Sequence, residues 1–87
     1  MSGLIRVAAQ SRTSSVAGAI AGAMREDGEA DVQAIGPGAV NQAMKAIAVA
    51  RGYLNGEGID IGVAPTMNDV DVNGAEMTAV RLSVFKR

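Results

Sequence analysis

The chain of 87 residues has no cysteine, no histidine and no tryptophan, and its aromatic side chains are limited to Tyr53 and Phe85. The absence of cysteine excludes disulfides and thiolate metal sites. Cysteine nucleophiles, histidine general bases and Ser-His-Asp triads are excluded as well, so carboxylates, lysine, arginine and one tyrosine are the groups left for chemistry. We therefore expect a non-enzymatic protein with no catalytic residue, no bound metal and no cofactor.

The sequence also lacks an excess of charge of either sign, because eight Lys and Arg stand against nine Asp and Glu. A net charge of -1 gives the molecule as a whole no attraction to nucleic acid or acidic lipid, so such binding needs a local basic patch. No apolar run approaches the roughly 18 residues of a membrane span, and the first residues lack the pattern of a signal peptide. We expect a cytoplasmic, soluble protein that does not contact membranes.

Alanine supplies much of the apolar content, with sixteen copies in the chain. With so little aromatic volume, the interior must be built from small aliphatic side chains, which favours close packing of the helices. We expect one domain over residues 1–87, and a domain of this size has a marginal core unless self-association adds to it.

Apolar spacing and glycines divide the first part of the chain into two strand–helix units. Val16, Ile20 and Met24 recur at four-residue spacing, which predicts a helix, and the hydroxyl of Thr13 or Ser14 is suited to cap its first free amides. The expected elements are a strand over residues 4–9, a helix over 15–27, a strand over 31–35, a turn over 36–38 and a helix over about 39–54.

The last part of the chain predicts a β-hairpin. Apolar residues alternate around Ile61, Pro65 interrupts the pattern, and alternation resumes before Asn73-Gly74. Asn-Gly between alternating apolar runs is a strong hairpin signal, because both turn positions need positive φ. Val80, Leu82 and Val84 form the returning strand.

The element order β-α-β-α-β-β predicts an α/β fold, an α+β sandwich of two layers. Right-handed crossovers place both helices on one face of a four-stranded mixed sheet whose last two strands form the hairpin. The bare sheet face, or the outer side of the second helix, is then free for self-association or ligand contact. The second helix is the better candidate because its apolar surface is broad, with Ala46, Ala48, Val49, Ala50 and Tyr53.

Two polar segments follow the first two strands, at the edge of an open α/β sheet where ligands bind. Gln10–Ser14 supplies an arginine, hydroxyls and the start of a helix, all of which suit a phosphate backbone, although a plain capping loop explains it equally well. Gly36-Pro37-Gly38 precedes a helix, and the free amides at the start of that helix are suited to bind an anion. The spacing of the glycines matches neither a P-loop nor a dinucleotide-binding fingerprint. Taken alone, the motif is better explained as a structural turn, and the proximity of Asn41, Gln42 and Lys45 supports the phosphate interpretation as the alternative.

Other patterns favour structural explanations. Gly18 and Gly22 give the first helix a face of small residues, which predicts close packing on the sheet or on a partner. Asp69, Asp71 and Glu76 gather near the hairpin tip, where a solvated strand that resists edge pairing is a better explanation than a carboxylate metal site or an acid–base pair.

Two long segments resemble the stage V sporulation protein S family. They are residues 14–22, Ser-Ser-Val-Ala-Gly-Ala-Ile-Ala-Gly, and residues 33–52, which run from Gln-Ala-Ile-Gly-Pro-Gly to Ala-Arg-Gly without a gap. The family is small, acts in bacterial sporulation and developmental regulation, and has an Alba-like fold whose members often bind DNA or RNA as dimers. The resemblance therefore implies a regulator that binds nucleic acid as a dimer. The apolar surface of the second helix favours it as the contact between copies in a homodimer or higher homo-oligomer.

The same resemblance implies which residues face nucleic acid. They are Gln10, Ser11, Arg12, Thr13, Ser14, Gly36, Gly38, Asn41, Gln42 and Lys45, together with the hairpin around Asn73-Gly74. The hairpin departs from the family pattern because its carboxylates repel phosphate. A protein-interaction or assembly module without nucleic-acid binding is the alternative function, and a binder of a small anion or nucleotide at Gly36–Gly38 is a third.

Overall fold

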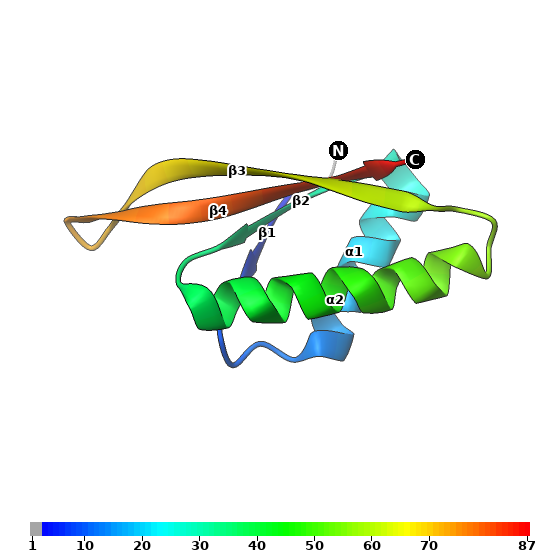
Figure 1. Cartoon of the computed structure of the whole chain (residues 1–87), viewed down its shortest axis with the longest axis horizontal. Helices are drawn as coiled ribbons and strands as arrows, with labels where there is room; N and C mark the ends of the chain where they lie inside the picture. Colours follow the sequence, from blue (N-terminus) through cyan, green and yellow to red (C-terminus); the bar gives the residue numbers. More distant parts are fainter. Residues whose placement is uncertain (1–2) are drawn as a thin grey trace.

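The computed structural model describes residues 3–87, and its elements follow the predicted order β-α-β-α-β-β (Figure 1). The elements are β1 (Leu4–Val7), α1 (Thr13–Asp27), β2 (Glu29–Ala34), α2 (Pro37–Asn55), β3 (Ile61–Val72) and β4 (Ala75–Lys86). The expected boundaries differ from these by a few residues, since β1 is shorter, β2 begins earlier and both helices begin two residues earlier than their spacing indicated.

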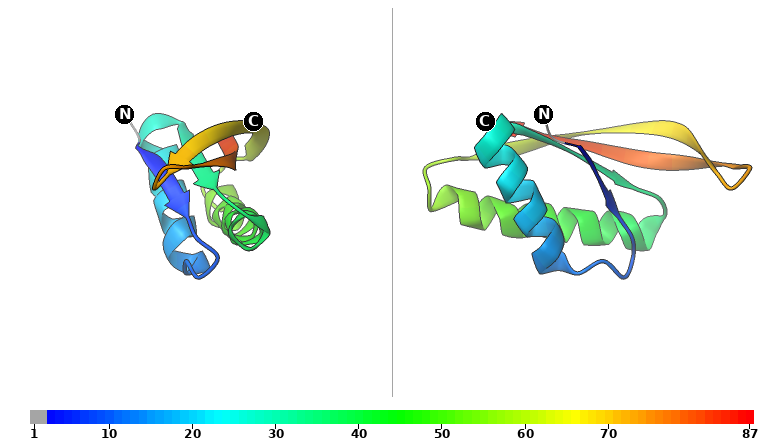
Figure 2. Two further views of the ribbon diagram at one scale, coloured as in Figure 1. Left: turned by 90° about the vertical axis from the view of Figure 1, so that its left-hand side faces the viewer. Right: turned by 180° about the vertical axis from the view of Figure 1, so that it is seen from behind.

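The sheet has the strand order β1-β2-β4-β3, in which β1 and β2 are parallel and the other two pairs are antiparallel. Both helices cover one face of this sheet and leave the other face uncovered, as the two side views in Figure 2 show. The predicted two-layer α+β architecture is therefore confirmed. The return strand β4 inserts between β2 and β3, so β3 lies at an open edge.

The core lies between the sheet and the helices and is made of small side chains. Alternate residues of β2, namely Ala30, Val32 and Ala34, are buried against the helices. The buried stripe of α2 consists of Ala39, Ala43, Ala46, Ile47, Ala50 and Leu54. Ala46 and Ala50, which were expected to extend the exposed apolar surface of this helix, belong to that stripe because helical periodicity places them in line with Ala43 and Leu54.

The hairpin of β3 and β4 differs from expectation at Pro65. The strand β3 runs without interruption from Ile61 to Val72, because an edge strand needs hydrogen bonds on one side only and tolerates a residue without an N–H group. At the tip, Asn73 and Gly74 have φ values of 52° and 82°, which confirms the expected turn.

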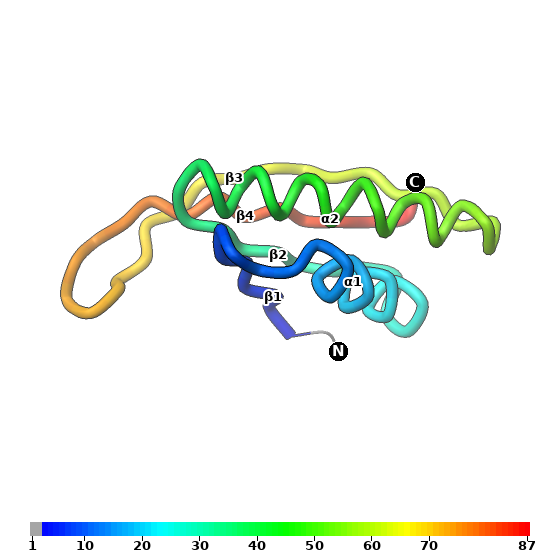
Figure 3. Tube along the Cα trace, turned by 90° about the horizontal axis from the view of Figure 1, so that it is seen from below, coloured from blue at the N-terminus to red at the C-terminus, as the bar shows by residue number. Residues whose placement is uncertain are grey.

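The end of the hairpin forms a free arm, defined here as residues 68–79. The pairing of β2 with β4 ends at Ala34 and Val80, so beyond this point β3 and β4 pair only with each other. Viewed from below, this part of the hairpin lies past the first turn of α2 (Figure 3).

Two exposed ion pairs hold the segment after α2. Arg25 of α1 donates hydrogen bonds to both carboxylate oxygens of Glu57, at 2.6 to 3.1 Å, and Arg51 of α2 donates to Asp60 at 2.8 Å. The hydrogen bond from Arg25 lowers the pKa of Glu57 below its ordinary value of 4.5, and that from Arg51 lowers the pKa of Asp60 below 3.8, in both cases against a smaller opposing effect of burial.

These pairs predict a stability that depends on pH. A carboxylate whose pKa is lowered by folding favours the folded state above its unfolded pKa, and this contribution is lost as the pH falls through the folded-state pKa. We expect the wild type to melt at a higher temperature than the double variant Glu57→Gln, Asp60→Asn at neutral pH. This difference should shrink as the pH falls below about 4.5 and vanish only below the lowered folded-state pKa values of the two carboxylates. Thermal unfolding followed by circular dichroism measures this difference, and a difference independent of pH contradicts the expectation.

Candidate functional site

The loop between β1 and α1, residues 8–12, is closed by its own hydrogen bonds. The backbone N–H of Ala8 donates to the Ser11 hydroxyl at 2.8 Å, and the N–H of Ser11 donates to the carbonyl of Ala8 at 3.0 Å. These bonds turn the chain after Val7, which is why β1 ends there and not at Ala9. Gln10 and Arg12 are left exposed on the loop.

Helix α1 begins without a side-chain cap, contrary to the expectation for Thr13 or Ser14. Arg12 occupies the capping position in extended conformation, and its carbonyl accepts the N–H of Val16 at 3.1 Å. The Thr13 hydroxyl accepts a hydrogen bond from Gln42, and Ser14 is exposed. The first amides of α1 therefore have no side-chain partner in the part of the chain that the structure describes.

Helix α2 also begins without a side-chain cap. Gly36 precedes it with a φ of 90°, and Pro37 occupies the first turn, where its missing N–H costs no hydrogen bond. Gly38 lies against the loop after β1, because a Cβ built on it would come within 3.0 Å of the Cβ of Ala9. Glycine at this position is what lets α2 approach the loop so closely.

Gln42 joins the loop to α2. Its side-chain amide nitrogen donates to the carbonyl of Ser11 at 2.6 Å and to the hydroxyl of Thr13 at 3.2 Å. An amide nitrogen carries two hydrogens, so both donors of Gln42 are engaged. Gln42 was predicted to face nucleic acid, and the structure gives it a positioning role within the site.

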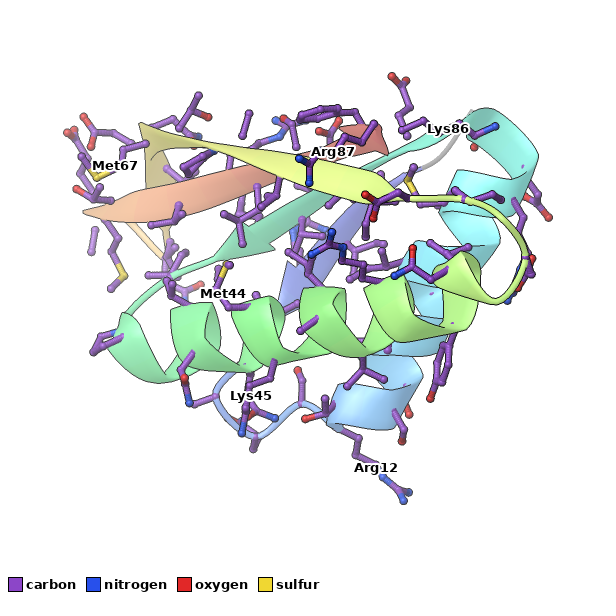
Figure 4. The ribbon with its side chains drawn as sticks, turned by 45° about the vertical axis from the view of Figure 1, so that its right-hand side comes forward. Arg12, Met44, Lys45, Met67, Lys86 and Arg87 are labelled. Carbon is purple, nitrogen blue, oxygen red and sulfur yellow. The ribbon has the colours of Figure 1, made fainter. Side chains whose placement is uncertain are left out.

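Two basic residues of the site are exposed and lack partners among residues 3–87. Arg12 and Lys45 make no hydrogen bond or ion pair there, whereas Arg25, Arg51 and Arg81 each pair with a carboxylate. Figure 4 shows Arg12 and Lys45 pointing away from the sheet on the helical side of the molecule. The two charges are therefore available to a ligand.

The acidic residues lie in other parts of the chain. All nine fall within residues 26–31 and 57–76, so the loop, the start of α1 and the whole of α2 contain none. No acidic side chain occupies the first turn of either helix. The local charge of this surface is therefore positive although the net charge of the chain is -1.

The predicted residues come from two segments that the structure brings together, through the contact of Gly38 with Ala9 and the bonds of Gln42. We call this surface the loop–helix site. Its members are Gln10, Ser11, Arg12, Thr13, Ser14, Gly36, Gly38, Asn41, Gln42 and Lys45. The hairpin tip around Asn73-Gly74 projects beyond the start of α2 and carries the acidic residues of the arm (Figure 1).

Sequence reasoning missed Ala9 as a neighbour of α2 and missed the positioning role of Gln42. Gln42 and Ser11 are 31 residues apart in the sequence, and no local pattern predicts a hydrogen bond between residues so far apart. The only available signal was the placement of both segments after neighbouring parallel strands, whose carboxyl ends meet at one edge of a sheet.

Comparison with solved structures defines the class of fold. Alba from Thermoplasma volcanium matches with a TM-score of 0.66, covering 95% of this chain and 99% of that chain at 10% sequence identity. The protein therefore has an Alba-like fold. At the level of sequence, the family model described as Stage V sporulation protein S matches residues 3–87, and the chain belongs to that family. Both findings confirm the resemblance drawn from the sequence.

Within the described residues, neither helix combines the length and apolarity that a membrane crossing requires.

The role of Gln42 predicts a specific effect of its removal. In Gln42→Ala the Ser11 carbonyl and the Thr13 hydroxyl lose their common donor, so we expect a loss of about 1 kcal/mol in unfolding free energy and faster amide exchange in residues 10–14. Urea unfolding and hydrogen exchange by NMR measure the two effects. Asn41→Ala is the matched control, since Asn41 is exposed and makes no such bond. Equal behaviour of the two variants would contradict the positioning role.

Proposed function

We propose that the protein is a non-enzymatic regulator that binds the phosphate backbone of nucleic acid through the loop–helix site of a homo-oligomer. The observation that carries the proposal is the composition of the loop–helix site. It contains two uncapped helix starts, two cations, Arg12 and Lys45, that have no partner among residues 3–87, and no carboxylate. Membership of the Stage V sporulation protein S family supports a role in sporulation-related regulation.

The chemistry of the site suits phosphate more than bases. Arg12 and Lys45 supply charge, the first amides of α1 and α2 supply neutral donors at the positive end of a helix dipole, and Ser14 adds an exposed hydroxyl. Donors of this kind contact sugar and phosphate oxygens without reading sequence. We therefore expect binding with little sequence preference.

The number of charges limits the affinity. Each neutralised phosphate of a duplex steepens the dependence of log K on log salt by about 0.9, so two cations per protomer predict weak, salt-sensitive binding. A homo-oligomer presents the site more than once on a single particle, which raises the overall affinity without new contacts. Self-association through α2 is therefore part of the proposal.

An assembly module that engages protein and not nucleic acid is the second candidate. It is favoured by the exposed apolar side chains of α2 and the hairpin, among them Met44 and Met67, which are 41% and 75% exposed. The carboxylates of the arm also favour the assembly module, because their negative charge repels the phosphates of nucleic acid.

Charge reversal at the site discriminates between the two candidates. We expect Arg12→Glu and Lys45→Glu each to weaken binding of labelled duplex DNA or single-stranded RNA at least about tenfold in fluorescence anisotropy at low salt, and to flatten the salt dependence. Lys86→Glu is the matched control, because Lys86 also has no partner within residues 3–87 and lies at a distance from the other two in Figure 4.

Loss of affinity in all three variants alike would assign binding to overall charge and not to the loop–helix site. Absence of binding by the wild type at low salt would refute the proposal and leave the assembly module as the remaining candidate.

A further inference from the structure

Strand β1 forms the second open edge of the sheet, at the opposite side from β3. It pairs with β2 alone, so the backbone N–H and C=O groups of alternate β1 residues face away from the sheet. Within residues 3–87 these outward groups have no hydrogen-bond partner. An edge of this kind is able to pair with one further strand.

The two edges of the sheet differ in how well they resist such pairing. Strand β3 contains Pro65, which has no N–H group to donate, and Asp69 and Asp71, whose charges oppose the approach of another strand. Strand β1, with the sequence Leu-Ile-Arg-Val, contains neither a proline nor a carboxylate. Strand β1 is therefore the edge better suited to receive an extended chain.

A groove lies between this edge strand and helix α1. The β1–α1 groove has a volume of about 370 Å³ and is lined by Gly3, Ile5, Ala19, Gly22, Ala23, Glu26 and Asp27. Figure 3 shows β1 and α1 together on one side of the molecule, with α2 and β3 on the other. The groove shares no residue with the loop–helix site or with the arm.

Helix α1 gives the groove a wall of small residues. Ala19, Gly22 and Ala23 supply this wall, and none has a side chain larger than a methyl group. A Cβ built on Gly22 would meet no atom within 4 Å. A strand paired with β1 turns alternate side chains towards α1, where these small residues leave room for branched apolar groups. The groove therefore favours an extended chain with apolar residues at every second position.

The charge of the groove is negative. Glu26 and Asp27 are exposed in the last turn of α1, and no basic residue lines the groove among residues 3–87. Arg25, the one cation of that turn, is bonded to Glu57 across the surface, whereas Glu26 has no ion pair within residues 3–87. A basic residue in the bound chain complements this charge, and an acidic chain or a nucleic acid is repelled.

We propose that the β1–α1 groove binds an extended apolar–basic segment of a partner protein, which adds to β1 as a fifth strand. Backbone hydrogen bonds to β1 supply affinity, and alternate apolar side chains against α1, with a basic residue beside Glu26, supply specificity. The four residues of β1 span about 13 Å and the stretch of α1 from Ala19 to Asp27 spans about 12 Å, so a segment of four or five residues fills the groove. This inference goes beyond the proposed function and does not depend on it.

Fluorescence anisotropy with labelled peptides tests the proposal. The probe is a capped peptide of eight residues, in which an apolar residue alternates with threonine over six positions and two lysines follow. Three versions carry valine, isoleucine or leucine as the apolar residue. We expect at least one version to bind the wild type, and replacement of its lysines by glutamate to weaken binding at least about tenfold.

Two variants of the protein locate the binding. Gly22→Gln fills the groove from α1 without a clash, and we expect it to weaken binding at least about tenfold. Gly52→Gln is the matched control, because Gly52 is also a helical glycine with open space at its Cβ and lies outside the groove. Glu26→Lys should reverse the preference, so that the glutamate peptide binds better than the lysine peptide. Circular dichroism of each variant verifies the fold.

Backbone methylation of the peptide distinguishes strand addition from apolar contact alone. In an added strand the N–H groups of alternate residues face β1 and those of the other residues face water. We therefore expect N-methylation of one alternate set to weaken binding at least about tenfold and N-methylation of the other set to change it less than about twofold. Hydrogen exchange by NMR should also show slower exchange of β1 amides in the complex.

The outcomes decide the proposal without involving nucleic acid. Absence of binding by all three versions, equal behaviour of Gly22→Gln and Gly52→Gln, or equal effects of the two methylated sets refutes strand addition in this groove. Peptide binding that weakens as the protein is concentrated assigns the edge to a second copy of the chain and contradicts the proposal. Gly22→Gln should bind duplex DNA as the wild type does, so failure here is distinguishable from failure of the proposed function.

Discussion

The close approach of two alanine-rich helices to one face of the sheet is the constraint on which the other features depend. Buried methyl groups such as those of Ala17, Ala21, Ala43 and Ala50 each contribute little, on the order of 0.8 kcal/mol, so the core is stable only when many of them pack together. Because these side chains are small, the first turns of both helices lie close to the sheet. That closeness allows Gly38 to touch the loop after β1.

The loop–helix site is a consequence of this packing. Strands β1 and β2 are adjacent and parallel, so the loops that follow them meet at one edge of the sheet. The side-chain amide of Gln42 in α2 then bonds to Ser11 in the loop after β1 and to Thr13 at the start of α1. The hydroxyl of Thr13 accepts from Gln42 and that of Ser11 accepts from the N–H of Ala8, so neither hydroxyl caps a helix. Uncapped amides and unpaired cations are thus exposed together, which is an arrangement suited to phosphate.

Charge is distributed by segment, and this gives the molecule two dissimilar surfaces. Basic side chains without partners lie at the loop–helix site, whereas the arm holds Asp69, Asp71 and Glu76 on one face and apolar side chains on the other. An acidic arm is poorly suited to phosphate, which is why the proposed contact with nucleic acid is confined to the loop–helix site.

The sequence by itself determined the element order, the helical face of Ile20 and Met24 and the tight turn at Asn73-Gly74, because these follow from local spacing and backbone preference. Its family resemblance also predicted the Alba-like fold. Tertiary structure alone decided that Pro65 continues β3, since only strand order shows that this strand lies at an edge. It likewise decided the roles of Thr13 and Gln42, because a hydrogen bond between residues 29 apart in sequence depends on how the layers pack and leaves no local pattern.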